Sequence, residues 1–280
     1  MEIHKELKQN NNPYTKQRFS KALGFSRGSF YYQSKLDPKD KELALKILRE
    51  HDENDDTLGH KKLGKLLGTG KNRVRRVMKK HGIEARRRKK SYKYAGKSNE
   101  TFANLANSQS FAELEVIFTD MFEVTLADGT KIRGCFALRK STRQILSLVF
   151  DYSMRAEIVV STLDRIDFVD WQEVLWHSDQ GSQYGAEITV DKLIEKGFIA
   201  SMSRAGTPTD NGSAERFVGV FKLAVAKRRR YHTLGEFLSA SEKWVNFYNH
   251  RRPHEALGQI SPNEFAKQNG KKTVPYVTVF

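Results

Sequence analysis

The chain has 280 residues and a formal net charge of +16. This length is enough for a catalytic domain with a sizeable core and one or two small modules. A single cysteine, Cys135, excludes an intramolecular disulfide, and the N-terminal histidines have no thiols near them of the kind that four-ligand zinc sites use. No apolar run approaches the length of a membrane span, and the first residues lack a signal-peptide core. We therefore expect no membrane partner and a cytoplasmic location.

The positive charge is concentrated in one stretch of the chain. Residues 58–97 contain sixteen basic residues and one acidic residue, whereas residues 101–280 contain twenty-two basic and twenty-one acidic residues. A charge confined in this way predicts a polyanionic partner, because a merely solubilising charge would be spread over the whole surface. Nucleic acid is the leading candidate. An anionic membrane is the weaker alternative, since no apolar face of the kind that an interfacial helix needs adjoins the stretch.

The N-terminal part of the chain predicts short helices. We expect a small helix-turn-helix-like segment over residues 1–36, a helix-turn-helix DNA-binding domain over residues 37–83, and a basic linker over residues 84–104. In the second of these, a glycine-containing turn separates two short helices, which is typical of the motif. A structural helix pair with a solvated basic face is the alternative. The density of basic residues favours DNA binding, through Lys61, Lys62, Arg73, Arg75, Arg76, Lys79, Lys80, Arg86, Arg87 and Arg88.

Residues 105–230 predict an α/β core. Short runs rich in Val, Ile and Phe, separated by turn signals, indicate three consecutive antiparallel strands, and helical patterns then alternate with strands. This order implies a mixed sheet. The expected strands are residues 114–119, 132–138, 144–150, 174–176 and 198–202, and the expected helices are residues 156–166, 187–196 and 211–227. Residues 231–280 are expected to form a C-terminal helical extension and tail.

Three carboxylates occupy positions from which they can meet. Asp120 is expected at the C-terminal end of the first core strand, Asp179 follows a later strand, and Glu215 lies one turn into the last core helix. Functional groups converge at strand ends in open α/β sheets, and three carboxylates there need cations to offset their repulsion. Hard oxygen ligands suit Mg²⁺ or Mn²⁺, and two such ions can clamp the oxygens of a phosphoryl transfer. Taken singly, each carboxylate is better explained as a cap, a turn residue or a partner of a helix dipole.

Four further residues are candidates for DNA contact. Asn211 and Lys222 lie four residues before and seven after Glu215, so all three share one helical face. The alternatives are that Asn211 caps the helix and that Lys222 is simply solvated. Arg251 and Arg252 lie among aromatic residues, where arginines can grip phosphates or pair with acidic residues of the protein. The sequence leaves their role open.

Several ordered motifs resemble one family. They are FTD at 118–120, HSDQGSQY at 177–184, SMSRAGTPTDNGSAERFVGVFK at 201–222, FYNHRRPHEALGQISPNEF at 247–265, and GHKKLGKLL followed by NRVRRVMKKHGI in the N-terminal part. Together with the 35 residues between Asp179 and Glu215, they resemble the OrfB-type transposases of bacterial insertion sequences, which have a retroviral-integrase-like core. One departure concerns Arg139 and Lys140, which stand where family members usually have an aspartate closing the second core strand.

The resemblance implies an RNase H-like core in which Asp120, Asp179 and Glu215 form a catalytic, metal-binding DDE triad. It implies cleavage of element ends and strand transfer with Mg²⁺ or Mn²⁺, two ions in each active site, and no nucleotide cofactor. The implied partners are double-stranded DNA (terminal repeats and target), further copies of the chain on DNA, and the product of an upstream reading frame. The implied location is the bacterial cytoplasm, in association with the nucleoid. Two alternatives stay open: a DNA-binding regulator with a catalytically silent core, and a metal-dependent nuclease without strand transfer.

Overall fold

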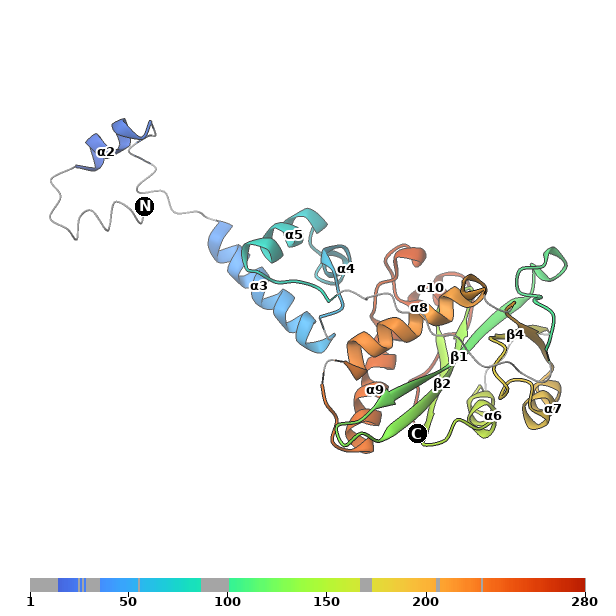
Figure 1. The fold of residues 1–280 in the computed structure, drawn as a ribbon. Coiled ribbons are helices and arrows are strands. Elements are labelled where there is room, and N and C mark those ends of the chain that lie inside the picture. The colour runs from blue at the N-terminus through green and yellow to red at the C-terminus, as the bar shows by residue number, and fades with distance from the viewer. Residues whose placement is uncertain are drawn as a thin grey trace. The chain divides into compact units, whose positions relative to one another are not determined.

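The computed structural model describes residues 15–24, 26, 28, 36–54, 56–86, 101–166, 173–204, 207–227 and 229–279. The chain divides into two compact units, Met1–Leu45 and Lys46–Phe280. Helix α2 (Lys16–Ala22) belongs to the first unit, and α3 (Leu36–Glu53) contains the boundary (Figure 1). Arg87 and Arg88 of the predicted DNA-binding set, most of the predicted linker and much of the segment over residues 1–36 lie outside the described residues.

The second unit contains a five-stranded mixed sheet, as the sequence predicts. Its spatial order is β3-β2-β1-β4-β5, with β1 antiparallel to β2 and parallel to β4. Strand β1 is central and forms hydrogen bonds with a strand on each side, so its backbone is held rigidly. The strands are β1 (Glu115–Thr125), β2 (Lys131–Arg139), β3 (Ile145–Asp151), β4 (Val174–Ser178) and β5 (Phe198–Met202).

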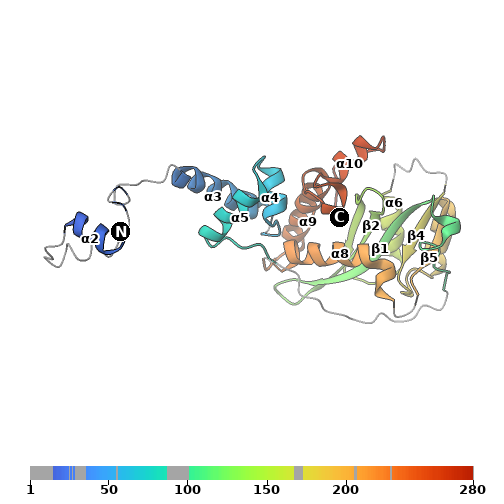
Figure 2. The same cartoon turned by 90° about the horizontal axis from the view of Figure 1, so that it is seen from above.

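Helices cover both faces of this sheet (Figure 2). On one face, the Ser147 hydroxyl of β3 donates to the Thr162 carbonyl of α6. On the other face, Phe150 of β3 packs edge-on against Phe237 of α9, with ring centroids 4.9 Å apart. Because side chains alternate along a strand, Ser147 and Phe150 belong to opposite faces. The covering helices are α6 (Glu157–Asp164), α7 (Glu187–Glu195), α8 (Gly212–Phe221) and α9 (Leu234–His250).

Aromatic side chains fill the layer between the sheet and helices α8 and α9. Phe136 of β2 lies 4.4 Å from Phe217 between ring centroids, and Phe122 of β1 lies 5.3 Å from Phe221. A buried aromatic side chain contributes about 1.5–3 kcal/mol through removal of apolar surface from water. Gly134 of β2 makes this layer possible, since a Cβ there would meet the Phe122 ring at 2.6 Å. The layer holds α8 against β1.

Two short helices, α4 (His60–Leu66) and α5 (Lys71–Lys80), form a tight pair around the predicted glycine turn. Gly64 allows the turn to lie against α4, because a Cβ at that position would meet the Thr69 carbonyl at 2.8 Å. One face of α5 is buried through Val74, Val77 and Met78. The structure therefore contains the two short helices around a glycine turn that the sequence predicts.

The C-terminal segment is tied to the second unit by asparagine side chains. The Asn263 side chain accepts from the Val274 amide and donates to the Val274 carbonyl, at 2.9 and 2.8 Å. Asn246 of α9 makes the same two contacts with Val277, at 2.8 and 3.1 Å. Each asparagine side chain thus forms hydrogen bonds with both the N–H and the C=O of one valine in the tail, which is not part of the sheet. Helix α10 (Pro262–Gln268) precedes this tail. None of the helices in the described part of the chain is long and apolar enough to span a membrane.

Candidate active site

Asp120 lies in the middle of β1 and not at its C-terminal end. The expectation that the strand ends at residue 119 is wrong, because β1 continues to Thr125 as one arm of a hairpin with β2. Asp120 itself pairs with Phe136, and pairing persists to Thr125 and Lys131. The polar pair Thr119-Asp120 interrupts the apolar run without ending the strand, because the antiparallel ladder with β2 continues and Phe122 and Val124 are buried beyond it. Asp120 therefore has a rigid backbone on a half-buried position.

Asp179 follows β4 directly and lies level with Asp120. In the parallel ladder, Phe118 of β1 is paired with His177 of β4. Asp120 and Asp179 each lie two residues further along the chain, and the charge of Asp179 acts on Asp120, so the two carboxylates lie near one another. One oxygen of Asp179, Oδ1, accepts a hydrogen bond from the Gly181 amide at 3.0 Å. This contact orients the carboxylate within its turn.

Glu215 lies in the first turn of α8, and a contact from the preceding residues fixes that turn on β1. The Asn211 side chain donates from Nδ2 to the Thr119 carbonyl at 2.9 Å. Asn211 is at the cap position of α8, but its side chain makes no capping hydrogen bond. The capping alternative for Asn211 is therefore wrong. Its amide instead holds the start of α8 one residue from Asp120.

The electrostatics of Asp120 show that the three carboxylates are close enough to interact. Burial raises the pKa of Asp120 from its ordinary value to about 8, and the negative charges of Asp179 and Glu215 also act to raise it. The Met121 amide and the Lys222 ammonium act in the opposite direction. The pKa of Asp179 is also raised, mainly because of burial. A cation beside Asp120 would relieve this unfavourable concentration of negative charge.

The donor set consists of carboxylate oxygens, which suit a hard divalent cation such as Mg²⁺ or Mn²⁺. Among the residues that the structure describes, no three His, Cys, Asp or Glu side chains are grouped as a ready metal cage. The arrangement is thus one carboxylate on β1, one directly after the neighbouring strand β4, and a third within electrostatic range on helix α8. The chemistry of the donors fits such an ion.

Lys222 brings a positive charge near Asp120. Its Nζ lies 5.6 Å from the centre of the Phe122 ring, and its charge lowers the pKa of Asp120. Phe122 is two residues after Asp120, on the same face of β1. The chain leaves the α-helical path at Lys222, where the π-helical turn η4 (Lys222–Ala226) begins. The expectation that Lys222 lies on the carboxylate side of α8 agrees with these contacts.

Two supporting residues were missed at the sequence level. His177 is buried between the hydroxyls of Ser201 and Ser203, at 2.9 and 3.0 Å, and joins β4 to the end of β5. Burial lowers its pKa from the ordinary value to about 4, which keeps it neutral near neutral pH. Asp210 is a buried carboxylate that accepts a hydrogen bond from Asn104. In the sequence, His177 lies two residues before Asp179, and Asp210 directly precedes Asn211. Neither position reveals the distant residues that these side chains contact.

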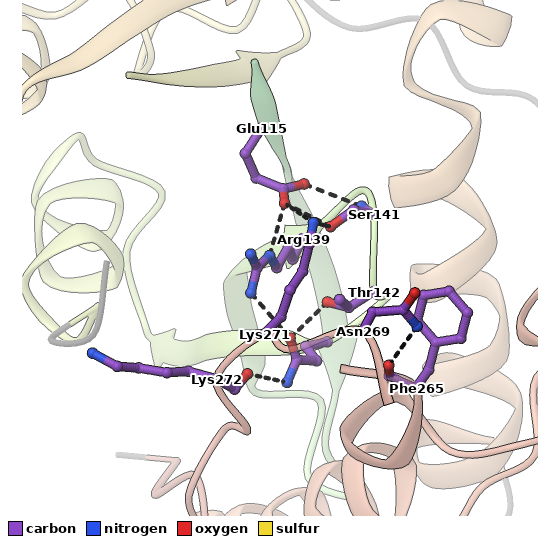
Figure 3. A network of polar contacts seen from close by, with 9 residues as sticks. Glu115, Arg139, Ser141, Thr142, Phe265, Asn269, Lys271 and Lys272 are labelled. Carbon is purple, nitrogen blue, oxygen red and sulfur yellow. Dashed lines mark hydrogen bonds and ion pairs between the residues drawn. The ribbon is translucent and has the colours of Figure 1, made fainter. Parts of the chain in front are cut away.

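A separate polar cluster explains Arg139, which stands where the family resemblance leads one to expect an aspartate. Its Nε donates to Glu115 at 2.9 Å, and the Lys271 ammonium lies 3.1 Å from the same carboxylate (Figure 3). Burial by itself would raise the pKa of Glu115. The Ser141 hydrogen bond and the Arg139 charge outweigh this and hold the pKa below its ordinary value. Glu115 is about 17 Å from Asp120 along the strand, so the cluster is not part of the carboxylate site.

The predicted DNA-binding residues fall into different environments. On α5, the side chains that share its outer face are exposed, namely Arg73, Arg75, Arg76, Lys79 and Lys80, and Arg86 is also exposed. Lys61 is half exposed and pairs with Glu255 at 2.8 Å. Lys62 is largely shielded from solvent, and desolvation lowers its pKa from the ordinary value to about 7. The basic face thus belongs to α5 more than to α4.

Arg251 and Arg252 contact side chains of residues 50–57, at the end of α3 and just after it. Arg251 forms ion pairs with Glu50 and Glu53, at 3.3 and 3.5 Å. Arg252 is 3% exposed and donates to the Thr57 hydroxyl at 2.8 Å. Its guanidinium also lies 5.9 Å from the centre of the Trp244 ring. The structure gives both arginines protein partners, and the burial of Arg252 leaves its guanidinium little access to solvent.

Comparison with known proteins agrees with this architecture. Residues 196–262, which include Glu215 and Arg251, match the family model described as "Integrase core domain". The chain is 24% identical over 260 residues to the uncharacterized 31.7 kDa protein of insertion element IS407 from Burkholderia multivorans, with 91% of each chain covered. It is 25% identical to the 31 kDa protein of IS600 from Shigella sonnei, over 88% of this chain and 97% of that one.

A shorter match has a higher identity. Over 91 residues, about a third of either chain, the identity to the transposase of insertion element IS629 from Shigella sonnei is 38%. Among solved structures, the simian T-cell lymphotropic virus intasome matches with a TM-score of 0.48 and 14% identity, over 83% of this chain and 77% of that chain.

The family match indicates an integrase core domain that includes residues 196–262, and the mixed sheet belongs to the same unit of the chain. The chain is similar over most of its length to insertion-element proteins, and over about a third of its length to one that is named a transposase. The fold class and the family that the sequence motifs indicate are both confirmed.

Proposed function

We propose that this chain is a DNA transposase in which Asp120, Asp179 and Glu215 bind divalent cations, two in each active site. The observation that carries the triad is the environment of Asp120, whose pKa is raised by burial and by both other carboxylates. Such a group is costly to ionise unless a cation neutralises its surroundings. The similarity to insertion-element proteins over nine-tenths of the chain, and to the IS629 transposase over about a third of it, supports a role in transposition.

Each carboxylate has a distinct positional role in this proposal. Asp120 is fixed by the ladder between β1 and β2, and Asp179 by the parallel register and the Gly181 amide. Glu215 approaches from α8, so its position depends on how the start of that helix is held. The three carboxylates would hold the metal ions, which would supply charge stabilisation for the phosphoryl transfer.

The remaining residues of the site act on the DNA. Lys222 provides a positive charge near Asp120, where the carboxylates would otherwise repel phosphates. The exposed basic face of α5 grips the backbone of element ends, and this contact is independent of base sequence. The proposed partners are double-stranded terminal repeats and target DNA, further copies of this chain, and the product of an upstream reading frame. Residues that the structure does not describe, Arg87 and Arg88, remain part of the proposed basic stretch.

The experiment uses the full chain and labelled duplexes that carry the ends of its own element. Parent protein is incubated with Mg²⁺, with Mn²⁺ or with chelator, and nicked, joined and circular products are separated. Asp120→Asn, Asp179→Asn and Glu215→Gln should each lower cleavage by at least ~10²–10³-fold and leave DNA binding intact. Glu187→Gln is a matched control, because Glu187 is an exposed glutamate in the first turn of α7.

The products separate this function from its competitors. Joined products support a transposase. Nicked products without joined ones would indicate a nuclease, and metal-independent DNA binding without either would indicate a regulator with a silent core. Near-normal cleavage by one of the three triad variants would remove that residue from the metal site.

A further inference from the structure

Asp210, in the short helical turn η3 (Pro208–Asn211) before α8, is a buried carboxylate with five donors around it. Its oxygens accept from the side-chain amides of Asn104 and Asn107, at 2.8 and 3.1 Å. The other three donors belong to Arg204: the main-chain N at 3.2 Å, Nε at 3.0 Å and Nη2 at 3.2 Å. The Asp210 side chain is only 3% exposed. Protein donors therefore saturate this carboxylate, and it is not available as a metal ligand.

The next residue is anchored in another direction. Asn211 donates to the Thr119 carbonyl of β1, whereas Asp210 binds the segment that precedes β1 in the chain. Two consecutive residues thus attach the start of α8 to two separate parts of the core. Glu215 follows one turn later, so its approach to Asp120 is set by these two anchors.

The segment that receives Asp210 is itself held on the sheet. The Leu105 amide donates to the Ser201 hydroxyl at 3.0 Å, and the Met202 amide donates to the Ala103 carbonyl at 3.3 Å. Ser201 in turn contacts His177, two residues before Asp179. We call the five hydrogen bonds to Asp210 its clamp. Through Ser201 and His177, this clamp is connected to the end of β4, which precedes Asp179.

We infer that Asp210 is a positioning residue for Glu215, acting through the start of α8 and the Asn104–Asn107 segment. The inference rests on the proposed role of Glu215 as a metal ligand. The hydrogen bonds from Arg204 keep the pKa of Asp210 below its ordinary value, so the acceptor remains ionised at neutral pH. Displacement of a catalytic group by about 1 Å costs ~10²-fold in rate, and a clamp with several donors prevents such a displacement.

The test compares Asp210→Asn with parent protein in the full chain. The variant keeps the size of the side chain but loses its charge and one acceptor oxygen, so at most part of the clamp can form. We expect a fall in kcat for end cleavage of ~10–10²-fold with little change in KM for DNA. Binding of Mn²⁺, measured by electron paramagnetic resonance without DNA, should weaken in parallel, because Glu215 is no longer held near Asp120.

A reciprocal variant and a remote one complete the design. Asn104→Asp combined with Asp210→Asn exchanges the carboxylate and the amide, and it should restore part of both kcat and Mn²⁺ binding. Asp128→Asn is the matched control, since Asp128 is an exposed carboxylate that accepts from Thr130 in the β1–β2 turn. Thermal unfolding of every variant identifies a general loss of fold, which the reciprocal exchange would not repair selectively.

The outcomes distinguish this inference from the proposed function. If Glu215→Gln cleaves normally, the triad is wrong and the role of Asp210 fails with it. If Glu215→Gln is inactive while Asp210→Asn retains parental kcat and Mn²⁺ affinity, the triad stands and the positioning role is overturned. The positioning role is also overturned if cleavage by Asp210→Asn falls while its Mn²⁺ binding does not.

Discussion

Asn211 donates from its side-chain Nδ2 to the main-chain carbonyl of Thr119, over 2.9 Å, and so joins helix α8 to strand β1. The ladder between β1 and β4 ends at Phe118 and His177, one residue before this contact. Asn211 thus supplies a donor to the main chain next to Asp120. The sequence suggests the Asn211 side chain as a DNA ligand or a helix cap. In the structure it connects the helix that carries Glu215 to the strand that carries Asp120.

The first prediction concerns Asn211→Ala. It should lower the free energy of unfolding by about 1–3 kcal/mol, because a buried carbonyl loses its donor. It should also lower cleavage per folded molecule, since the start of α8 is released from β1. Urea unfolding and cleavage assays check the two effects. Asn249→Ala is the control, because Asn249 is buried and makes two similar hydrogen bonds to Ile145 on the edge strand. Equal loss of cleavage in both variants would show that Asn211 has no special relation to the site.

Lys222 provides the second prediction. Its charge acts on Asp120, and phosphates approaching the carboxylates need such a compensating cation. Lys222→Ala should weaken end cleavage and Lys222→Glu should weaken it more, with the folded state intact by circular dichroism. Lys243→Glu, on the exposed face of α9, is the control. Cleavage by Lys222→Glu at the parental rate in moderate salt would place the DNA path on another face.

The basic face of α5 provides the third. If it grips phosphates, the logarithm of the binding constant should fall with the logarithm of salt concentration by ~0.9 per phosphate neutralised. Replacing Arg75, Arg76 and Lys79 together by glutamine should flatten this slope by ~2–3, because glutamine releases no counterions. Fluorescence anisotropy over a salt series measures the slope. Replacing Lys243 and Lys267, which are exposed in the C-terminal part, should leave the slope unchanged.

The fourth prediction is a pH dependence of stability caused by Lys62. Desolvation, with a smaller contribution from the Arg252 charge, lowers the pKa of Lys62 to about 7, whereas Glu255 opposes the shift. Between pH 7 and the ordinary lysine pKa of 10.5, the unfolded chain binds the proton and the folded chain does not. This group therefore makes stability rise with pH across that window, and its cost is largest below pH 7.

Lys62→Met should consequently raise the melting temperature at pH 6 and give a smaller gain at pH 9. Calorimetry at the two pH values measures the difference. Lys65→Met, at an exposed position on α4, is the control and should show no such pH dependence. A gain for Lys62→Met that is equal at both pH values would mean that Lys62 is charged in the folded state.

The neighbouring arginines give the fifth prediction. Arg252→Ala should lower the free energy of unfolding by about 1.5–3 kcal/mol, because a buried charged donor to Thr57 and its packing on Trp244 are lost. Arg251→Ala should cost only about 0–1 kcal/mol, since the Arg251 side chain is about half exposed to solvent and its ion pairs are screened. Chemical denaturation distinguishes the two. A larger loss for Arg251 than for Arg252 would contradict the burial seen in the structure.

The sequence by itself determined the order of elements and the candidate carboxylates. Alternating apolar residues and turn signals such as Asp128–Gly129 depend on local backbone preferences, so the five strands and the helices around Glu215 were predictable. The family motifs are also short stretches of consecutive residues. They indicated the integrase-type core that the comparisons support.

Only the tertiary structure decided how those residues are held. The extension of β1 past Asp120 depends on pairing with β2, and the polar pair Thr119-Asp120 does not reveal whether a partner strand continues beside it. Asp210 binds residues more than a hundred positions earlier in the chain, and Asn211 binds a carbonyl 92 positions away. Arg252 is likewise basic in sequence and buried in the fold. Such contacts depend on which surfaces the packed helices and strands bring together, and a residue's type and local spacing carry no information about that.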